Sequence, residues 1–158
     1  MGVAFIPAVV GLITNSTGSK ILLIKRDKEP FKNLWSLPGG KIESYEYLSQ
    51  SIIREIDEEI SIKCTIQEYL GTVSEKVYES DKLTRHHIIH VFHLFNKSAL
   101  SQHDCKWFTI SKLKSVKNIT PSDIAIIDNM FFKKVSNYFD CKMIYDGSKY
   151  NLLKFVAL

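Results

Sequence analysis

The chain has 158 residues, 45% hydrophobic and 24% charged, which is the size and composition of one ordinary soluble domain. Its longest early apolar run, residues 3–13, is broken by Pro7 and falls short of the ~20 residues that a membrane-spanning helix needs, so we expect no membrane anchor there. The net charge of +4 is not gathered into a basic, aromatic-rich module, so the sequence does not indicate nucleic-acid binding.

The first half of the chain predicts two strands, a loop and a helix. Residues 3–14 and 20–25 are apolar and flank the turn sequence NSTGS, which predicts a hairpin. Residues 26–35 are polar and contain Pro30, which predicts a loop, and LPGG at 37–40 predicts a turn that needs glycine at positive φ. Apolar residues recur every fourth position across residues 47–60 and predict an amphipathic helix.

Two further strands are predicted in the middle of the chain. Residues 64–77 and 86–95 concentrate β-branched and aromatic side chains, as strands do. Another short element is expected to begin at residues 107–108.

The last third of the chain predicts a helix and a hairpin. Residues 122–137 follow the start signal TPSD, in which Ser122 or Asp123 can cap the free backbone N–H groups of the helix. Residues 142–158 resemble a hairpin that turns at Asp146-Gly147. Because the strands and helices do not alternate regularly, and no linker divides the sequence, we predict one domain over residues 1–158, an α+β sandwich with a mixed sheet.

An acidic cluster interrupts this basic chain on the helix of residues 47–60. Glu55, Glu58 and Glu59 stand at i, i+3 and i+4 and fall within an arc of roughly 100° beside the apolar stripe. Like charges at this spacing oppose helix formation, and a bound divalent cation would offset that repulsion. A solvated helix face is the alternative interpretation of such a cluster taken alone.

The cluster lies inside a longer pattern that resembles the signature of the Nudix hydrolases. That signature is a glycine, five residues, Glu, seven residues, Arg-Glu, an aliphatic residue, any residue, Glu-Glu, any residue, a glycine and an aliphatic residue. The positions of this chain that correspond to the signature are Gly40, Glu46, Arg54, Glu55, Ile56, Glu58, Glu59, Ser61 and Ile62. Only Ser61 departs from the pattern, where a glycine would suit a left-handed C-terminal residue.

The resemblance implies a Nudix-type α/β/α sandwich and hydrolysis of a pyrophosphate bond in a nucleotide with Mg²⁺ or Mn²⁺. Carried over by position, the metal ligands would be the Gly39 carbonyl, Glu55, Glu58 and Glu59. Glu55 or a neighbouring glutamate would activate water, with Arg54 holding a glutamate in place. Glu46 would brace the loop that starts at Gly40 through a salt bridge. Asp104 is the nearest later acid that could supply a base or a further ligand.

Four residues outside the signature are candidates for substrate binding, each with a plainer alternative. Arg26 and Lys41 could hold phosphate oxygens or be solvated surface charges. Trp35 could stack on a base or ribose, or belong to the core. Asp123 lies where related enzymes contact the base, although helix capping explains the same residue.

Two other site types are weaker. His86 and His90 would share one face of a strand, but no third ligand accompanies them, so zinc is not the favoured interpretation. Cys64, Cys105 and Cys141 are widely spaced without a Cys-x-x-Cys pair, which predicts free thiols in a reducing, cytoplasmic setting.

The substrate stays open between two classes of nucleotide. ADP-ribose is placed first, because Pro30, Phe31 and Trp35 lie just before the metal turn and could pack on a terminal ribose or base. A MutT-like nucleoside triphosphate, normal or oxidised, is the alternative indicated by GGKIE and TPSD. A catalytically idle nucleotide sensor is a third possibility, although it would be expected to have lost a glutamate of the signature. A homodimer is an alternative to a monomer.

Overall fold

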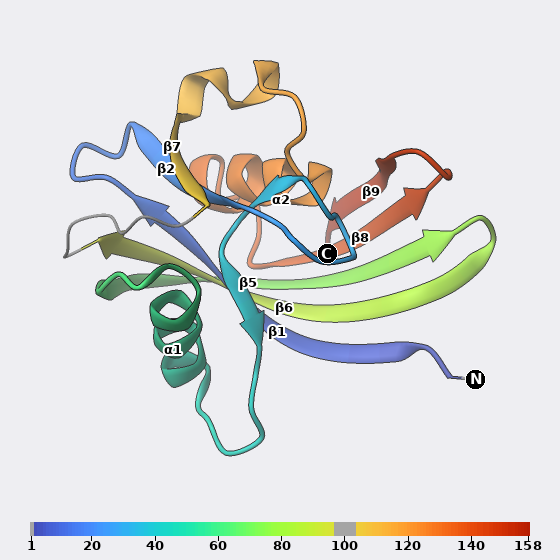
Figure 1. Cartoon of the computed structure of the whole chain (residues 1–158), viewed down its shortest axis with the longest axis horizontal. Coiled ribbons are helices and arrows are strands. Elements are labelled where there is room, and N and C mark those ends of the chain that lie inside the picture. Colours follow the sequence, from blue (N-terminus) through green and yellow to red (C-terminus); the bar gives the residue numbers. More distant parts are fainter. Residues whose placement is uncertain (1, 97–103) are drawn as a thin grey trace.

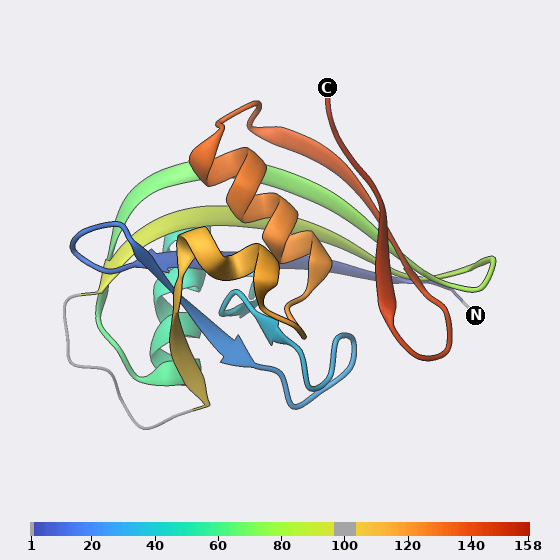
Figure 2. The ribbon, with the colours of Figure 1, turned by 90° about the horizontal axis from the view of Figure 1, so that it is seen from above.

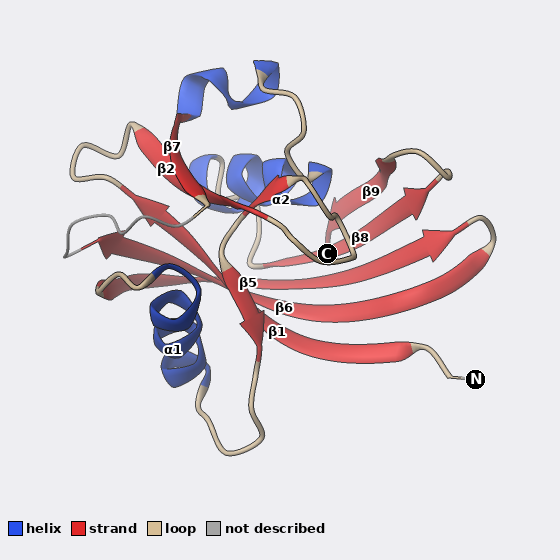
Figure 3. Ribbon diagram, viewed as in Figure 1, coloured by secondary structure: helices blue, strands red, loops and turns tan. Residues whose placement is uncertain are grey.

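A computed structural model describes residues 2–96 and 104–158 as one mixed sheet with helices on both faces (Figure 1, Figure 3). The strands are β1 (Ala4–Thr14), β2 (Lys20–Lys25), β3 (Trp35–Ser36), β4 (Gly39–Lys41), β5 (Cys64–Glu79), β6 (Lys82–Asn96), β7 (Cys105–Thr109), β8 (Tyr138–Tyr145) and β9 (Tyr150–Ala157). The helices are α1 (Leu48–Ile60), a 3₁₀ helix η1 (Ile110–Ser115), and α2 (Pro121–Ile126), which continues into a π-helical segment η2 (Ile127–Phe132). None of the described helices is long and apolar enough to span a membrane.

The strand order is β3-β2-β1-β6-β5-β8-β9, with β4 paired to β1 and β7 paired to β2. The centre of the sheet is the long antiparallel pair β5–β6, while β1 runs parallel to β6 and β8 runs parallel to β5. The sheet is therefore mixed, as the sequence predicts.

Alternate side chains of β2 enter two separate cores. Leu22 and Ile24 of β2 pack with Ile52 and Ile56 of α1 on one face. Ile21 of β2 belongs to the core of the opposite face, under α2 and η2. Figure 2 shows α2 and η2 lying across β5 and β6 on that second face. The period of two on the strands and of nearly four on α1 thus produces the expected α/β/α layers.

The two predicted hairpins and the first helix are present. β1 and β2 are antiparallel, and β8 and β9 are joined by the turn that contains Asp146 and Gly147. Helix α1 ends at Ser61, whose φ of 52° is the left-handed conformation in which a glycine would be unstrained.

The second helix differs from its prediction at both ends. The N-cap is Thr120, and no side chain caps the helix, so the interpretation of Ser122 or Asp123 as a cap is wrong. The helix ends at Phe132 rather than at residue 137, because the chain reverses through Lys134, at φ 48°, before β8 begins. The short strands β3 and β4 and the helix η1 were not predicted.

The LPGG sequence is not a turn at positive φ. Gly39 and Gly40 lie in strand β4, and neither has a positive φ. A Cβ on Gly39 would overlap the Val9 carbonyl oxygen, and a Cβ on Gly40 would overlap the carboxylate of Glu55. Glycine is required here by the close approach of neighbouring atoms, not by backbone conformation.

Candidate active site

Helix α1 carries the acidic cluster on the edge of its buried face. Ile52 and Ile56 are fully buried against the sheet, which fixes the rotation of the helix. With that rotation, Glu55 and Glu59 lie against strand β4. Glu58 is one turn after Arg54, and its side chain is 62% exposed.

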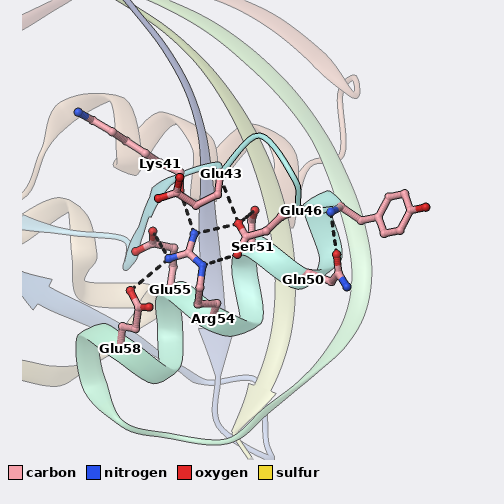
Figure 4. Close-up of polar contacts among 9 residues, drawn as sticks. Lys41, Glu43, Glu46, Gln50, Ser51, Arg54, Glu55 and Glu58 are labelled. Carbon is pink, nitrogen blue, oxygen red and sulfur yellow. Dashed lines mark hydrogen bonds and ion pairs between the residues drawn. The ribbon is translucent and has the colours of Figure 1, made fainter.

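Arg54 is the centre of the polar network that joins α1 to the preceding loop (Figure 4). Its Nη1 donates to Glu55 Oε1 at 2.9 Å and to Glu58 Oε2 at 3.1 Å. Its Nε and Nη2 bind both carboxylate oxygens of Glu46, and Nη2 also donates to the Lys41 carbonyl at 3.2 Å. One guanidinium therefore orients two glutamates of the signature and ties them to the loop.

Glu46 holds the loop before α1. Besides Arg54, it accepts hydrogen bonds from the Ser51 hydroxyl at 2.5 Å and from the Glu43 backbone N–H at 3.2 Å. The hydrogen bond from Arg54, followed by that from Ser51, lowers the pKa of Glu46 to about 2. This ion pair is the contact expected of a residue that braces the loop.

Glu59 faces the glycines of β4. Its Oε2 accepts a hydrogen bond from the Gly39 N–H at 2.9 Å. Burial raises the pKa of Glu59 to about 7, and the negative charge of Glu55 adds to the rise, while the Gly39 N–H and the charge of Arg26 oppose it. Two carboxylates that repel each other in a partly dry site are a place where a cation would be stabilised.

The residues around β4 have the donor atoms of a magnesium site but not the spatial arrangement of one. Carboxylates and a backbone carbonyl are the hard oxygen donors that Mg²⁺ and Mn²⁺ take. Within residues 2–96 and 104–158, however, no three His, Cys, Asp or Glu side chains stand close enough to hold a metal ion. Figure 4 shows Glu55 and Glu58 turned toward the guanidinium of Arg54, which binds them both.

We call the signature residues of α1, Arg54, Glu55, Glu58 and Glu59, together with Gly39 and Gly40 of β4, the box. A cleft of about 710 Å³ runs from this box over the sheet. Gly39, Gly40 and Glu59 line it beside the acidic cluster, and the predicted phosphate ligands Arg26 and Lys41 line it as well. The Nε of Arg26 donates to the Pro30 carbonyl at 2.8 Å, which holds the guanidinium in the loop between β2 and β3.

Asp123 lies in the same cleft and is 8% exposed. Its Oδ2 accepts a hydrogen bond from the Leu37 N–H at 2.9 Å, a contact that joins α2 to the segment before β4. Burial raises the pKa of Asp123 to about 7, against the opposing effect of the Leu37 hydrogen bond. The cleft therefore contains a buried acid in addition to those of the box.

Comparison with known families identifies this arrangement. The NUDIX domain family matches residues 4–130, which include the glycines of β4, all of α1 and Asp123. The chain belongs to the Nudix family. The prediction of a Nudix hydrolase with a Nudix fold is thus confirmed at the level of the family.

Two relatives of the chain carry different named activities. An ADP-ribose pyrophosphatase of Methanocaldococcus jannaschii is 38% identical over 84 residues, which are 53% of this chain but only 46% of that protein. A CTP pyrophosphohydrolase of Escherichia coli is 28% identical over 121 residues, which are 76% of this chain and 87% of the relative.

The solved structures agree on the Nudix fold. A MutT protein from Bacillus halodurans superposes with a TM-score of 0.69 at 17% identity, covering 93% of this chain and 97% of that chain. The NUDIX domain of Shewanella oneidensis NrtR, complexed with ADP ribose, superposes with a TM-score of 0.64 at 21% identity, covering 84% and 90%. At these identities the likeness concerns the fold alone.

Other candidates lie away from the Nudix cleft. Trp35 does not line it and packs edge-to-face on Phe108, with ring centroids 5.2 Å apart, beside the core under α2. Asp104 is exposed, does not line the cleft either, and accepts a hydrogen bond from the Lys25 N–H through its backbone carbonyl. Stacking by Trp35 and a catalytic role for Asp104 stay predictions without support from this geometry.

The two histidines considered for zinc have ordinary hydrogen-bond partners. His86 Nε2 lies 2.9 Å from the Ser74 hydroxyl, and His90 Nδ1 lies 2.8 Å from the Tyr69 hydroxyl. Burial lowers the pKa of both histidines. These contacts place them on the face of the sheet that carries α1 rather than in the cleft.

The sequence did not point to three polar residues that line the cleft, Glu75, Arg85 and His87. Glu75 and His87 lie on the strands predicted over residues 64–77 and 86–95, and Arg85 lies on β6 one residue before the predicted start of the second of these strands. Glu75 is an acid within a predicted strand, between Ser74 and Lys76, which was the available signal, but the face of the sheet that its side chain reaches depends on the strand register.

Proposed function

We propose that this Nudix protein is a metal-dependent pyrophosphohydrolase that cleaves a nucleoside triphosphate into a nucleoside monophosphate and pyrophosphate. The observation that carries the proposal is the cleft that Glu59 and the glycines Gly39 and Gly40 line together with the buried Asp123. Phosphates beside the box and a base near Asp123 would both fit within the volume of about 710 Å³.

The metal would be held by Glu55, Glu59 and the Gly39 carbonyl, with Glu58 joining them when it leaves Arg54. A bound divalent ion lowers the pKa of a coordinated water and neutralises the leaving phosphate. Glu55 or a neighbouring glutamate takes the proton of the attacking water. Arg54 keeps Glu55 and Glu58 in place through its hydrogen bonds, and Arg26 and Lys41 bind phosphate oxygens.

Three observations favour a triphosphate over ADP-ribose, which the sequence placed first. Trp35, one basis for ADP-ribose, packs on Phe108 outside the cleft. Asp123, the basis for a MutT-like substrate, lies inside the cleft and does not cap α2. The relative that acts on CTP also aligns over 87% of its length, against 46% for the ADP-ribose pyrophosphatase. Pro30 and Phe31 do line the cleft, so ADP-ribose stays the second candidate.

Chromatography of reaction products tests this choice. With Mg²⁺, a panel of CTP, dGTP, 8-oxo-dGTP and ADP-ribose is incubated with the protein. Release of pyrophosphate and a nucleoside monophosphate supports the proposal, whereas AMP and ribose 5-phosphate from ADP-ribose alone would replace it with the second candidate. No cleavage of any nucleotide would refute both.

The variant Glu58→Gln links any activity to the box. It keeps size and hydrogen bonding but removes a charge, so turnover of the accepted nucleotide should fall at least ~100-fold. Asp57→Asn is the matched control on the same helix, because Asp57 is exposed and pairs only with Lys63 in the described chain. An unchanged rate in Glu58→Gln would show that the activity does not come from this site.

A further inference from the structure

A polar row crosses the sheet where it lines the cleft. Strand register places Glu75 of β5 beside His87 of β6, and His87 in turn beside Ile6 of β1. Arg85 is two residues before His87 and therefore points to the same face of the sheet. All of these residues line the cleft, on strands that do not belong to the metal box.

Glu75 is a buried acid with few protein partners. It is 2% exposed, and its Oε1 lies 3.0 Å from His87 Nδ1. The other contact of its side chain within the described residues is weak, from the Cys141 thiol to Oε2 at 4.0 Å. An ionised carboxylate can accept about four hydrogen bonds, so Glu75 has acceptor capacity that the chain leaves unused. Such a group is costly to bury unless a ligand supplies donors.

The remaining walls near this row suit a flat ring. Ala4, Ile6 and Ala8 of β1 provide small or aliphatic side chains, and Pro30 and Phe31 line the same cleft from the loop between β2 and β3. Asp123 is close enough to Glu75 for the charge of one carboxyl to act on the other. Apolar walls with a few fixed polar groups are typical of a site that binds and orients one aromatic ligand.

We propose that the Glu75–His87 pair is a base-reading subsite that selects nucleotides whose base carries an exocyclic amino group. The amino group donates to the Glu75 carboxylate, and His87 holds that carboxylate in place through Nδ1. Arg85 lies on the same face and donates to a ring carbonyl where the base has one. Uracil and hypoxanthine lack the amino group, and they would leave Glu75 buried without a donor. This subsite rests on the proposed function for its biological meaning, although it holds equally for a triphosphate and for ADP-ribose.

Pairs of nucleotides that differ at the amino group test the subsite. We expect the amino-bearing member of an accepted pair, CTP against UTP or GTP against ITP, to have a kcat/KM at least ~10-fold higher, since a buried acceptor left unpaired disfavours the analogue. Glu75→Gln should reduce that ratio at least ~3-fold, because the amide is uncharged and a weaker acceptor. Glu79→Gln is the matched control, because Glu79 is exposed at the far end of the same strand.

Binding of products separates failure of the subsite from failure of the proposed function. Calorimetric titration with CMP, UMP, GMP and IMP needs no turnover, and it should show the same preference for amino-bearing bases in the wild type and its loss in Glu75→Gln. Circular dichroism of each variant checks that the fold is intact, and His87→Gln provides a second variant if Glu75→Gln is unfolded. Equal binding of paired monophosphates, an unchanged preference in the variants, or no binding of any monophosphate would each overturn the subsite. Absence of hydrolysis with selective binding would overturn only the proposed function.

Discussion

At the scale of single residues, Asp123 and Glu59 in the cleft have electrostatic surroundings opposite to those of Glu46 in the loop before α1. Glu46 is paired with Arg54, and its pKa falls to about 2. Asp123 is buried and Glu59 is partly buried, with few positive charges nearby, and the pKa of each rises to about 7. Glu46 is thus held ionised by its ion pair, whereas the carboxyl groups of Asp123 and Glu59 have pKa values near 7 in the cleft.

This difference predicts a pH dependence of stability. Asp123 has a folded pKa of about 7 against an unfolded value of 3.8, so between these values the native state keeps a proton that the unfolded chain has lost. The free energy of unfolding should therefore fall as pH rises through this window, with up to ~1.4 kcal/mol per pH unit from one group. Asp123→Asn keeps an acceptor for the Leu37 N–H and removes the proton. Urea unfolding at about pH 5 and about pH 7.5 should show a weaker pH dependence in the variant. An identical dependence in both proteins would contradict the assignment.

The box residues could be predicted from sequence because their meaning lies in local spacing. Arg54, Glu55 and Glu58 share one helix, so 3.6 residues per turn is enough to bring them together. Glu75 could not be predicted in this way, because its partner His87 is on another strand and the β5–β6 pairing contains three register shifts. A shift of one residue would turn Glu75 to the opposite face. The role of Gly39 and Gly40 was equally hidden, since it depends on contacts with Val9 and Glu55.

At the scale of elements, the C-terminal hairpin lies outside the residues 4–130 that match the family, yet it contacts the cleft. Tyr150 of β9 packs edge-to-face on Phe31, with ring centroids 4.5 Å apart, and its hydroxyl donates to Glu29 Oε2 at 3.1 Å. Phe31 has a φ of 68°, an unusual conformation for a residue other than glycine. The hairpin therefore supports a cleft loop whose own backbone is strained.

Replacing Tyr150 should affect substrate binding more than chemistry. Tyr150→Ala removes the ring against Phe31 and should raise KM for the accepted nucleotide several-fold with a smaller change in kcat, as expected when uniform binding is lost. Tyr150→Phe keeps the ring and loses only the bond to Glu29, so its effect should be smaller. Leu153→Ala is the control, because Leu153 is on the same strand and 56% exposed. A fall in kcat at unchanged KM would instead assign Tyr150 to the catalytic step.

The hairpin itself was predictable, because Asp146-Gly147 between two apolar runs is a local signal. The extent of the helix at residues 122–137 was not, because the apolar residues continue to Phe132 through a π-helical segment and the chain then turns at Lys134. The short strands β3 and β4 exist only through pairing with β2 and β1, which lie elsewhere in the sequence. Short strands that form only by pairing with a strand distant in the sequence cannot be recognised from the sequence alone.

At the scale of the whole molecule, a chain with a net charge of +4 gathers four of its 17 acidic residues on the second half of α1. Arg54 offsets part of this local charge, but Glu55 still raises the pKa of Glu59, so the repulsion within the box is not fully relieved. A polyphosphate is attracted to the positive remainder of the chain, while a divalent cation is attracted to the box.

Binding of a divalent cation should therefore stabilise the native protein. A ligand that binds only the folded state adds RT ln(1 + [L]/Kd), about 1.4 kcal/mol at ten times Kd, and ~1 kcal/mol shifts the Tm of a domain of this size by roughly 2–4 °C. Millimolar Mg²⁺ or Mn²⁺ should thus raise Tm by several degrees over the protein in chelator at matched ionic strength.

In Glu59→Gln the metal-dependent shift in Tm should shrink. The variant itself should melt no lower than the wild type in chelator near neutral pH, because a partly buried charge has been removed. Scanning calorimetry of both proteins, with and without metal, measures the two effects separately. Equal Tm values for the wild type with metal and with chelator would show that the box does not bind the cation before the nucleotide arrives.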